Sequence, residues 1–467
     1  MQIQFIGATE TVTGSKHLIT TDTGKNILLD CGMFQGEHER VHVNNHQLGF
    51  DPTTIDIVLL SHAHIDHSGL IPLMYKQHFR GKVYCTPATF DLCHVMLLDS
   101  AQIQEKDIEY INKKRKEEGR KKIEPLYEET DVMNSLTLFQ TIDYNEKVHV
   151  DENISFHFTD VGHILGSAAV HIDYSGIDGF KHLTFTGDIG RPDDKILNAP
   201  EPFRQADYII CESTYGDRLH ENSKESLDKL ESIINKTCVQ QKGKVIIPAF
   251  SLGRTQELVY ALDILKNQNK IPNIKVFVDS PLSAKTTAIM RAHMNLFNDE
   301  IKSYIDRTDG DPFIFKDIKY ITKVEDSKNL NTFKEPCIII SASGMAEAGR
   351  IKHHIKNHVE DSRNTILIVG YSSPGGLADR LKKHEPEVRI FGQFFAVNAS
   401  VETLESFSAH GDYNEMLQFL NCQNPKKVSR VFLVHGDDEA KLAFKEKLKQ
   451  AGFENVMIPK YKEKFDI

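Results

Sequence analysis

The sequence predicts an α/β fold that is divided into more than one domain. The chain has 467 residues, and a typical domain contains about 100–200. From about residue 208 onwards, apolar segments of strand length alternate with longer amphipathic segments, which is typical of a parallel sheet flanked by helices. Hydrophobic residues make up 40% and charged residues 26% of the chain, and this composition excludes fibrous and disordered classes.

The first part of the chain is rich in short predicted strands separated by Gly, Asp and Pro turn signals. These strands are expected at residues 2–6, 16–20, 26–29, 55–60, 154–160, 168–174 and 182–186. Helical periodicity is found at residues 68–78 and 86–99. Residues 102–125 contain a dense run of both charges, INKKRKEEGRKKIEP, which favours a solvated helix or a lid over a nucleic-acid-binding arm.

The second part of the chain alternates between predicted strands and predicted helices. The strands are expected at residues 208–211, 244–248, 275–278, 337–341, 365–371 and 431–434. Helices are expected at residues 223–237, 251–265 and 439–450. A further helix is expected to follow the segment FSAHGDY and to end at residue 418. Ser251 is the expected N-cap of the helix that it precedes, because a serine side chain can accept a hydrogen bond from the first turn.

The composition also restricts the compartment and the partners. No apolar run approaches the ~20 residues of a membrane span, and we expect no membrane association. The first residues lack the basic and apolar regions of a secretory signal. Seven cysteines are scattered without a CxxC pair, which favours a reducing cytoplasm over a disulfide framework. The net charge of -10 argues against unspecific polyanion binding, although a local basic groove remains compatible with it.

The strongest local signal directly follows the predicted strand at 55–60. There, His62, His64, Asp66 and His67 stand within six residues. Alternate side chains of an extended segment share a face, so His62 and His64 can meet one ion, whereas Asp66 and His67 begin the next element and can meet a second. Three imidazoles and one carboxylate are a ligand set suited to Zn²⁺. The alternative, four polar residues that cap a helix, does not account for this composition.

Further ligands must come from elsewhere, because one segment cannot fill two coordination spheres. His163 in VGHILGSA, Asp188 in FTGDIG and His435 in FLVHGDD each follow an apolar run and have a glycine nearby. Asp30 in LLDCGMFQG has the same setting and could orient a ligand histidine through a hydrogen bond. Each of these residues, taken alone, is more typical of an ordinary loop than of a metal site.

The ordered set HAHIDH, His163 and Asp188, with the preceding Asp30, resembles the motifs of the metallo-β-lactamase superfamily. Three matches narrow the resemblance to the β-CASP nucleases: Glu212 in CESTYGDR, His410 in SFSAHGD and His435 in FLVHGDD resemble their motifs A, B and C. PAFSLGRTQEL and SGMAEAGR also resemble β-CASP segments. The nearest pattern is that of RNA-cleaving members, which include the pre-mRNA 3′-end-processing endonucleases and their bacterial and archaeal counterparts.

The resemblance implies an αββα sandwich into which a β-CASP α/β domain is inserted. The expected boundaries are residues 1–207 for the first part of the sandwich, 208–395 for the insert and 396–467 for the remainder. The insert begins where the chain changes to alternating strands and helices.

The resemblance also implies a set of site residues. By this resemblance His62, His64 and His163 hold one Zn²⁺, whereas Asp66, His67 and His435 hold a second; Asp188 bridges both, and Mn²⁺ is a potential substitute. Such a pair of ions activates a hydroxide that attacks the phosphodiester bond of RNA. His410 is the expected general acid, and Glu212 would orient it and keep it protonated. Asp66 is expected to be essential for catalysis as well.

The substrate is expected to bind in a cleft between the sandwich and the insert. The candidate contacts are Arg254, Lys285, Ser280, Ser343 and Arg350, although a surface or capping role would suit each of them equally well. Arg254 is distinguished by its place at a predicted helix start, where the helix N-terminus and a guanidinium could both face a phosphate.

The leading hypothesis is therefore a metal-dependent hydrolase that acts as an endoribonuclease, with 5′-exonuclease activity as an open option, in RNA processing or decay. The alternatives are a DNA nuclease on the same scaffold, a small-molecule hydrolase and a non-catalytic RNA-binding subunit. A small-molecule hydrolase leaves the insert and the pair Glu212 and His410 unexplained, and a non-catalytic subunit would be expected to lack ligands. The sequence leaves the RNA target and the assembly state open, with a homodimer as one option.

Overall fold

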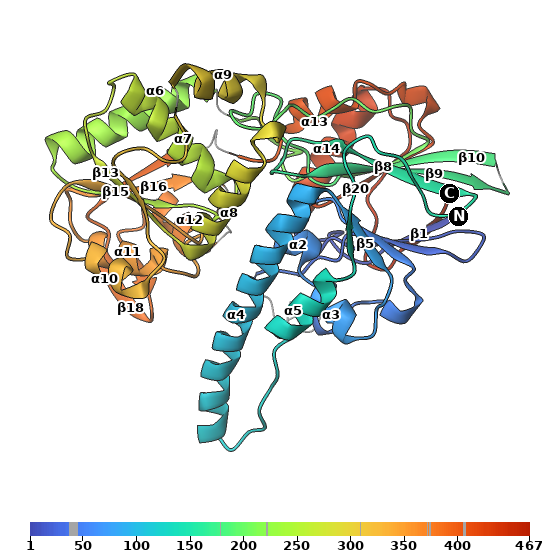
Figure 1. Ribbon diagram of the computed structural model, residues 1–467, viewed down its shortest axis with the longest axis horizontal. Helices are drawn as coiled ribbons and strands as arrows, with labels where there is room; N and C mark the ends of the chain where they lie inside the picture. Colours follow the sequence, from blue (N-terminus) through green and yellow to red (C-terminus); the bar gives the residue numbers. More distant parts are fainter. Residues whose placement is uncertain are drawn as a thin grey trace. The chain divides into compact units, whose positions relative to one another are not determined.

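The computed structural model describes residues 1–36, 45–177, 179–220, 223–308, 310–370, 372, 375–404 and 408–467. Two units make up the chain. Unit 1 contains Met1–Leu219 and His410–Ile467, and unit 2 contains His220–Ala409 (Figure 1). The chain therefore leaves unit 1 once, forms unit 2 and returns to complete unit 1. The sequence placed the ends of the insert at 208 and 395, and the division in the structure falls at 219/220 and 409/410.

Unit 1 contains two seven-stranded sheets. The order of the first sheet is β22 (Lys464–Asp466), β1 (Gln2–Phe5), β2 (His17–Thr20), β3 (Asn26–Leu29), β4 (Ile57–Leu59), β5 (Lys82–Cys85) and β6 (Phe139–Thr141). The order of the second sheet is β21 (Val456–Met457), β20 (Arg430–Val434), β11 (Tyr208–Glu212), β10 (Gly179–Phe185), β9 (Ala168–Gly176), β8 (Ile154–Asp160) and β7 (Val148–His149). In the second sheet, β10, β11 and β20 are parallel neighbours.

The two sheets pack face to face around an apolar core. This core includes Ile3 and Phe5 from the first sheet and Phe156, Phe185 and Phe432 from the second. The remaining layers are helices, which are α2 (Ile65–Ser68), α3 (Ile71–Lys76), α4 (Pro87–Glu117) and α5 (Glu129–Leu136) beside the first sheet, and α13 (Tyr413–Leu420) and α14 (Asp438–Gln450) beside the second. Short 3₁₀ turns lie at η1 (Pro52–Thr54) and η4 (Pro425–Lys427). The predicted αββα sandwich is confirmed.

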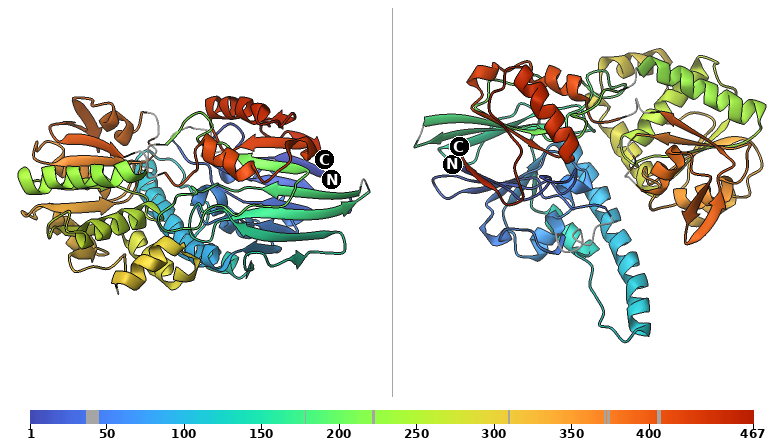
Figure 2. Two further views of the ribbon diagram at one scale, coloured as in Figure 1. Left: turned by 90° about the horizontal axis from the view of Figure 1, so that it is seen from above. Right: turned by 180° about the vertical axis from the view of Figure 1, so that it is seen from behind.

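Unit 2 contains a six-stranded parallel sheet flanked by helices. Its strand order is β14 (Ile318–Tyr320), β13 (Lys275–Asp279), β15 (Cys337–Ser341), β12 (Val245–Pro248), β16 (Thr365–Val369) and β19 (Ser400–Leu404). Its helices are α6 (Ser223–Ile234), η2 (Asn235–Gln240), α7 (Arg254–Asn267), α8 (Pro281–Ala292), η3 (Met294–Leu296), α9 (Asp299–Thr308), α10 (Val324–Leu330), α11 (Ile351–His358) and α12 (Leu377–Lys382). A hairpin of β17 (Glu387–Ile390) and β18 (Gln393–Ala396) completes the unit (Figure 2).

Several predicted element boundaries are wrong. The helix expected from residue 86 to 99 continues to Glu117, so that the solvated helix expected within residues 102–125 is found as far as Glu117 but belongs to the same helix, α4. The helix expected at 68–78 is replaced by the two short helices α2 and α3. The N-cap of α7 is Gly253 and not Ser251, because the first helical residue is Arg254. The Ser251 hydroxyl instead lies 3.2 Å from the hydroxyl of Ser280. A turn therefore separates Ser251 from the helix that it was expected to cap.

Two further features concern the cysteines and the apolarity of the helices. All seven cysteines are free thiols, and six of them are buried. In the part of the chain that the structure describes, we find no helix with the length and apolarity needed to cross a bilayer.

Candidate metal centre

The candidate metal centre lies at the ends of neighbouring strands of unit 1. Because β10, β11 and β20 are parallel, their carboxyl ends meet at one edge of the second sheet. Asp188 follows β10, Glu212 is the last residue of β11, and His435 directly follows β20. Three residues that are far apart in the sequence are therefore brought together by sheet topology.

The segment His62–His67 approaches this edge from the first sheet. It follows β4, and His64 is the N-cap of α2, so that His62 and His64 precede the helix and Asp66 and His67 lie in its first turn. Two backbone hydrogen bonds fix the neighbouring loop to α2. Cys31 N donates to His67 O at 2.7 Å, and Met33 N donates to Ile65 O at 2.9 Å. The loop can come this close because residue 32 is glycine: a Cβ atom there would lie 1.6 Å from Asp66 O.

His163 reaches the centre from the loop between β8 and β9. Its backbone N donates to the Ser167 hydroxyl at 3.0 Å, which shapes this loop. The loop packs directly on the segment that carries Asp188, because a Cβ atom on Gly190 would lie 2.0 Å from Gly162 O. Two glycines, at 32 and 190, therefore permit the close backbone approaches on which the centre depends.

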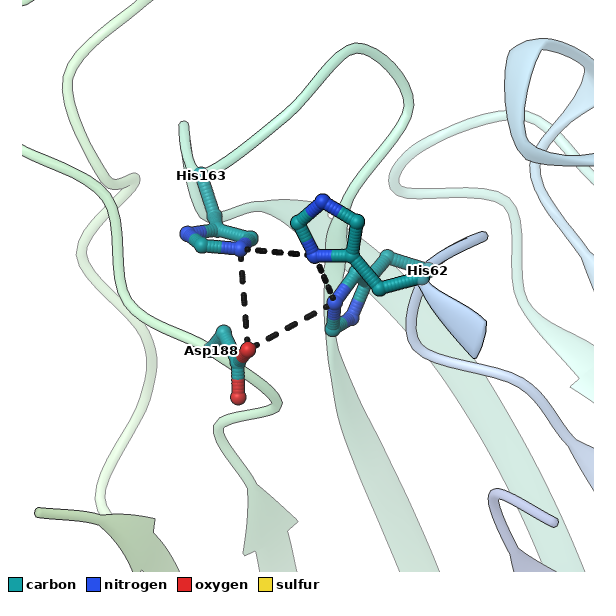
Figure 3. Close-up of side chains that lie close together, drawn as sticks. His62, His163 and Asp188 are labelled. Atoms are coloured by element: carbon teal, nitrogen blue, oxygen red, sulfur yellow. Dashed lines mark hydrogen bonds and ion pairs between the residues drawn. The ribbon is translucent and has the colours of Figure 1, made fainter. Parts of the chain in front are cut away.

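One group of donor atoms contains His62, His64, His163 and Asp188. Figure 3 labels three of these residues, His62, His163 and Asp188. The His64 Nδ1 atom lies 3.1 Å from His62 Nε2 and 3.3 Å from His163 Nε2. The Asp188 Oδ2 atom lies 3.5 Å from the Nε2 atoms of both His62 and His163. The four donors therefore surround a common point.

A second group contains Asp66, His67 and His435. The Nε2 atoms of His67 and His435 are 3.1 Å apart, and Asp66 Oδ2 lies 3.5 Å from His435 Nε2. The other oxygen of Asp188, Oδ1, faces this group at 3.3 Å from His67 Nε2. One carboxylate therefore presents one oxygen to each group, as a bridging ligand would.

These distances fit metal coordination. Zinc binds histidine nitrogen at about 2.0–2.1 Å, and two such ligands at a tetrahedral angle are about 3.4 Å apart. The buried Asp188 Oδ1 atom has no hydrogen-bond partner among the described residues, although charged and polar groups in a protein interior normally have one. A cation shared by these donors would satisfy that oxygen. The donor set of imidazoles and carboxylates is also the one that suits zinc.

The protonation states of three of the donors, His62, His64 and Asp66, favour a cation as well, whereas Asp188 and Asp30 raise the pKa of His67 against the effect of burial. Burial and the neighbouring His67 hold the pKa of His62 well below its usual value. Burial also lowers the pKa of His64 to about 4. Burial alone would raise the pKa of Asp66, but a hydrogen bond with His435 and nearby positive charge lower it to about 2. Neutral imidazoles and an ionised carboxylate are the forms that bind metals.

Other buried side chains orient the donors. Asp30 accepts from Ser61 N at 2.8 Å, and its Oδ2 atom lies 2.6 Å from His67 Nδ1, so the remaining nitrogen of His67 is directed at the centre. The Thr214 hydroxyl lies 3.0 Å from His435 Nδ1 and has the same effect on that ring. Asp30 was predicted from the sequence, whereas Ser61 and Thr214 were not. Ser61 directly precedes the histidine cluster, whereas nothing in the residue type of Thr214 marks it.

His410 and Glu212 form a pair beside both groups. His410 Nδ1 lies 3.1 and 3.2 Å from the two carboxylate oxygens of Glu212 and 3.9 Å from Asp188. Glu212 also accepts from the backbone N of Ile189 at 2.5 Å. Burial alone would lower the pKa of His410, but Glu212 and Asp188 raise it to about 9. The pair favours an imidazolium, and cations bound nearby would lower this pKa.

The five candidate substrate contacts all lie in unit 2. Arg254, Ser280 and Ser343 follow the neighbouring strands β12, β13 and β15, at the carboxyl edge of the parallel sheet. Arg254 is buried and pairs with Glu257, and Ser280 caps α8. Lys285 is exposed on α8.

Arg350 has defined partners in unit 2. It donates from Nη1 to buried Asp279 at 2.7 Å and from Nη2 to Thr322 O at 2.7 Å. These contacts give Arg254, Ser280 and Arg350 structural partners, and the role of all five residues in substrate binding stays a prediction.

Comparison with known proteins places the three parts of the chain in three family models. Residues 15–239 match the metallo-beta-lactamase superfamily, residues 255–381 match the Beta-Casp domain, and residues 395–459 match the Zn-dependent metallo-hydrolase RNA specificity domain. The chain is 34% identical to Ribonuclease TTHA0252 of Thermus thermophilus, over 95% of this chain and 95% of that protein. It is 30% identical to Endoribonuclease ysh1 of Schizosaccharomyces pombe, over 92% of this chain and 53% of that longer protein.

A solved structure supports the fold. The crystal structure of a protein of unknown function from Enterococcus faecalis V583 resembles this chain with a TM-score of 0.53 at 12% identity, and the similarity covers 99% of each chain.

Proposed function

Because the chain belongs to the β-CASP group of the metallo-β-lactamase superfamily, we propose that it is a zinc-dependent ribonuclease that hydrolyses RNA phosphodiester bonds. Ribonucleases and endoribonucleases of this hydrolase family are among its relatives, and the chain is an enzyme of the same kind. The proposal adds the substrate, the metal and the role of each residue. RNA processing or decay is the process in which such an activity would act.

The observation that carries this proposal is the pair of donor groups that share Asp188 next to His410. Ligand-like spacings of 3.1–3.5 Å recur in both groups. A small-molecule hydrolase would need the donor groups but not the histidine–carboxylate pair of His410 and Glu212. The combination favours phosphodiester hydrolysis, in which charge develops on phosphoryl oxygens while a leaving oxygen needs a proton.

Each side chain has a proposed role. His62, His64 and His163 would hold one zinc ion, Asp66, His67 and His435 would hold the second, and Asp188 would bridge them. When bound, zinc supplies Lewis acidity and lowers the pKa of water to about 7. Asp30 keeps the ring of His67 in the orientation and tautomer that direct Nε2 at the centre.

His410 is the proposed general acid. Its Nδ1 atom is hydrogen-bonded to the carboxylate of Glu212, so Nε2 is the atom that donates a proton to the leaving oxygen of the RNA. Glu212 holds the ring in place, since its own carboxylate is fixed by Ile189 N and Thr214 N. Arg254, Ser280, Lys285, Ser343 and Arg350 remain the proposed contacts of unit 2 with the RNA backbone.

The test is hydrolysis by the purified protein of RNA and DNA strands of the same sequence. We expect cleavage of RNA that stops with a chelator and returns with Zn²⁺, or with Mn²⁺ as a substitute. The Asp66→Asn variant should lose this activity, because an amide cannot replace the ionised carboxylate as a ligand. Faster cleavage of DNA than of RNA would contradict the assignment in favour of a DNA nuclease, and RNA binding without cleavage would favour a non-catalytic subunit.

The same preparation resolves the finer points of the proposal. RNA labelled at each end in turn separates internal cleavage from stepwise removal of nucleotides from the 5′ end. Light scattering tests the homodimer that the sequence analysis considered. A cytoplasmic location is also part of the proposal, because seven free thiols suit a reducing compartment.

A further inference from the structure

The far end of α4 is the most basic element of an acidic protein. Between Asn112 and Glu124 the chain has seven Lys or Arg residues and three Glu residues, whereas the whole chain has a net charge of -10. Nearly all of these basic side chains are exposed to solvent, among them Lys113, Lys116, Lys121 and Lys122. We call residues 110–122 the basic tip. The proposed mechanism does not use it.

The basic tip is joined to the candidate metal centre by one continuous helix, α4. At the start of α4, the hydroxyls of Thr86 and Thr89 both donate to Gly166 O, at 2.7 and 2.8 Å. Gly166 belongs to the loop that carries His163. The helix rises 1.5 Å per residue, so Lys116 lies about 40 Å along the axis from Thr89. Figures 1 and 2 show that the distal half of α4 extends beyond the other elements of unit 1.

The basic tip has a defined conformation. The Asn112 side chain pairs with the backbone of Ile123, donating to its oxygen at 2.8 Å and accepting from its N at 2.9 Å. Arg115 Nε donates to Lys121 O at 2.7 Å. The chain after the helix is thereby folded back onto the last turns, and lysines of the helix and of the returning segment are held close together.

An aromatic ring completes the arrangement. Tyr110 is 62% exposed, and Lys114 Nζ lies 4.8 Å from the centre of its ring. Exposed aromatic rings among basic side chains are the elements with which proteins bind single-stranded nucleic acid, through base stacking and phosphate contacts. A membrane surface fits less well, because Ile111 is the one aliphatic side chain of the basic tip that could enter a bilayer.

We propose that the basic tip of α4 binds the backbone of single-stranded RNA at a distance from the bond that is cleaved. This inference rests on the proposed ribonuclease function and assigns it a second contact region. It replaces the expectation from the sequence that residues 102–125 are a solvated helix or a lid and not a nucleic-acid-binding arm. A stacked strand advances about 3.4 Å per nucleotide, so the 40 Å between the start of α4 and the tip correspond to about 12 nucleotides. The tip therefore contributes to the binding of long substrates and not of short ones.

The test compares two variants of the whole protein. The tip variant carries Lys113→Gln, Lys116→Gln, Lys121→Gln and Lys122→Gln. The control variant carries Lys82→Gln, Lys460→Gln, Lys462→Gln and Lys464→Gln, which removes the same charge from exposed positions of unit 1. The substrates are single-stranded RNAs of about 30 and about 6 nucleotides, which are longer and shorter than the span of α4. The affinity for each RNA is measured at several salt concentrations, and kcat/KM is measured at one salt concentration.

We expect the tip variant to bind the long RNA roughly tenfold more weakly than the unmodified protein does. The slope of the logarithm of the binding constant against the logarithm of the salt concentration should also become less steep, by about 0.7 for each phosphate that the protein no longer neutralises. The short RNA and the control variant should give the same values as the unmodified protein gives. Equal reductions in both variants, or no reduction on the long RNA, would overturn the inference. Selective binding of phosphatidylserine vesicles through these lysines would overturn it in favour of a membrane. A protein that cleaves no RNA at all would instead refute the proposed function.

Discussion

At the scale of single residues, the most informative pair is His410 and Glu212. The carboxylate of Glu212, 3.1 Å from His410 Nδ1, is the main group that raises the pKa of His410 against the effect of burial. An imidazolium that donates a proton is active below its pKa, and the activity is lost as the pH rises through that pKa. The position of the alkaline limit of activity should therefore report on this carboxylate.

We expect Glu212→Gln to lower the pKa of His410, because the amide keeps the shape of the side chain but removes its charge. In a pH–rate profile of RNA cleavage, the alkaline loss of activity should begin at a lower pH than in the unmodified protein. His410→Ala serves as the control: it should reduce kcat by about 100- to 10,000-fold and abolish this limb, while emission spectrometry still finds the metal bound. Loss of metal from the His410 variant would mean that the histidine is a ligand, and an unchanged profile for Glu212→Gln would exclude its proposed role.

The residues of the metal centre differ in how visible they are in the sequence. His62, His64, Asp66 and His67 were identified from their spacing, because an extended segment followed by a helix start fixes their geometry locally. His163, Asp188 and His435 needed the resemblance to a family, since only the pairing of distant strands brings them together. Thr214 was missed, because a hydroxyl that orients a ring is indistinguishable in sequence from any other threonine.

At the scale of secondary structure elements, buried apolar patterns predicted most strands of the three large sheets, but they missed the buried strand β5 and the short or exposed strands. The helix α4 was predicted in two separate pieces, a helix at 86–99 and a solvated helix or lid within 102–125, because its apolar face has no core to cover beyond buried Ala101 and the periodicity stops there while the helix continues. The C-terminal strand β22 was missed, because it pairs with β1 through backbone hydrogen bonds and has only three residues, two of them charged. Backbone pairing leaves no trace in the side-chain pattern.

The close approach of α2 and the loop before it leads to a prediction at the same scale. Gly32→Ala would place a Cβ atom 1.6 Å from Asp66 O, so the loop and α2 must separate and the backbone hydrogen bonds between them must weaken. We expect a loss of about 3 kcal/mol in the free energy of unfolding, which lowers Tm by about 6–12 °C for a unit of this size, and a reduced metal content. Gly310→Ala is the matched control, because its Cβ atom would meet its nearest neighbour at an ordinary 3.6 Å. A variant with unchanged Tm and full metal content would contradict this account of Gly32.

At the scale of the whole molecule, the candidate metal centre joins two segments of the chain that unit 2 separates. His62, His64, Asp66, His67, His163 and Asp188 come from the segment before unit 2, and His435 comes from the segment after it. All donors therefore belong to unit 1, although the chain returns to that unit only at His410, after the residues of unit 2. A bound ion should stabilise unit 1 and link its two segments, because it binds the folded donors and not the unfolded chain.

The division into two units predicts which parts of the chain lose protection from hydrogen exchange when the metal is removed. At a zinc concentration about 1,000 times the dissociation constant, binding stabilises the folded form by about 4 kcal/mol, and a chelator removes this contribution. In hydrogen-exchange mass spectrometry, chelation should increase exchange in peptides that contain α2, the loop of His163 and the end of β20. Peptides from β12 and β15 at the centre of the sheet of unit 2 should exchange as before, because that unit supplies none of the proposed donors. Increased exchange confined to unit 2, or none at all near α2, would mean that the ions are held elsewhere.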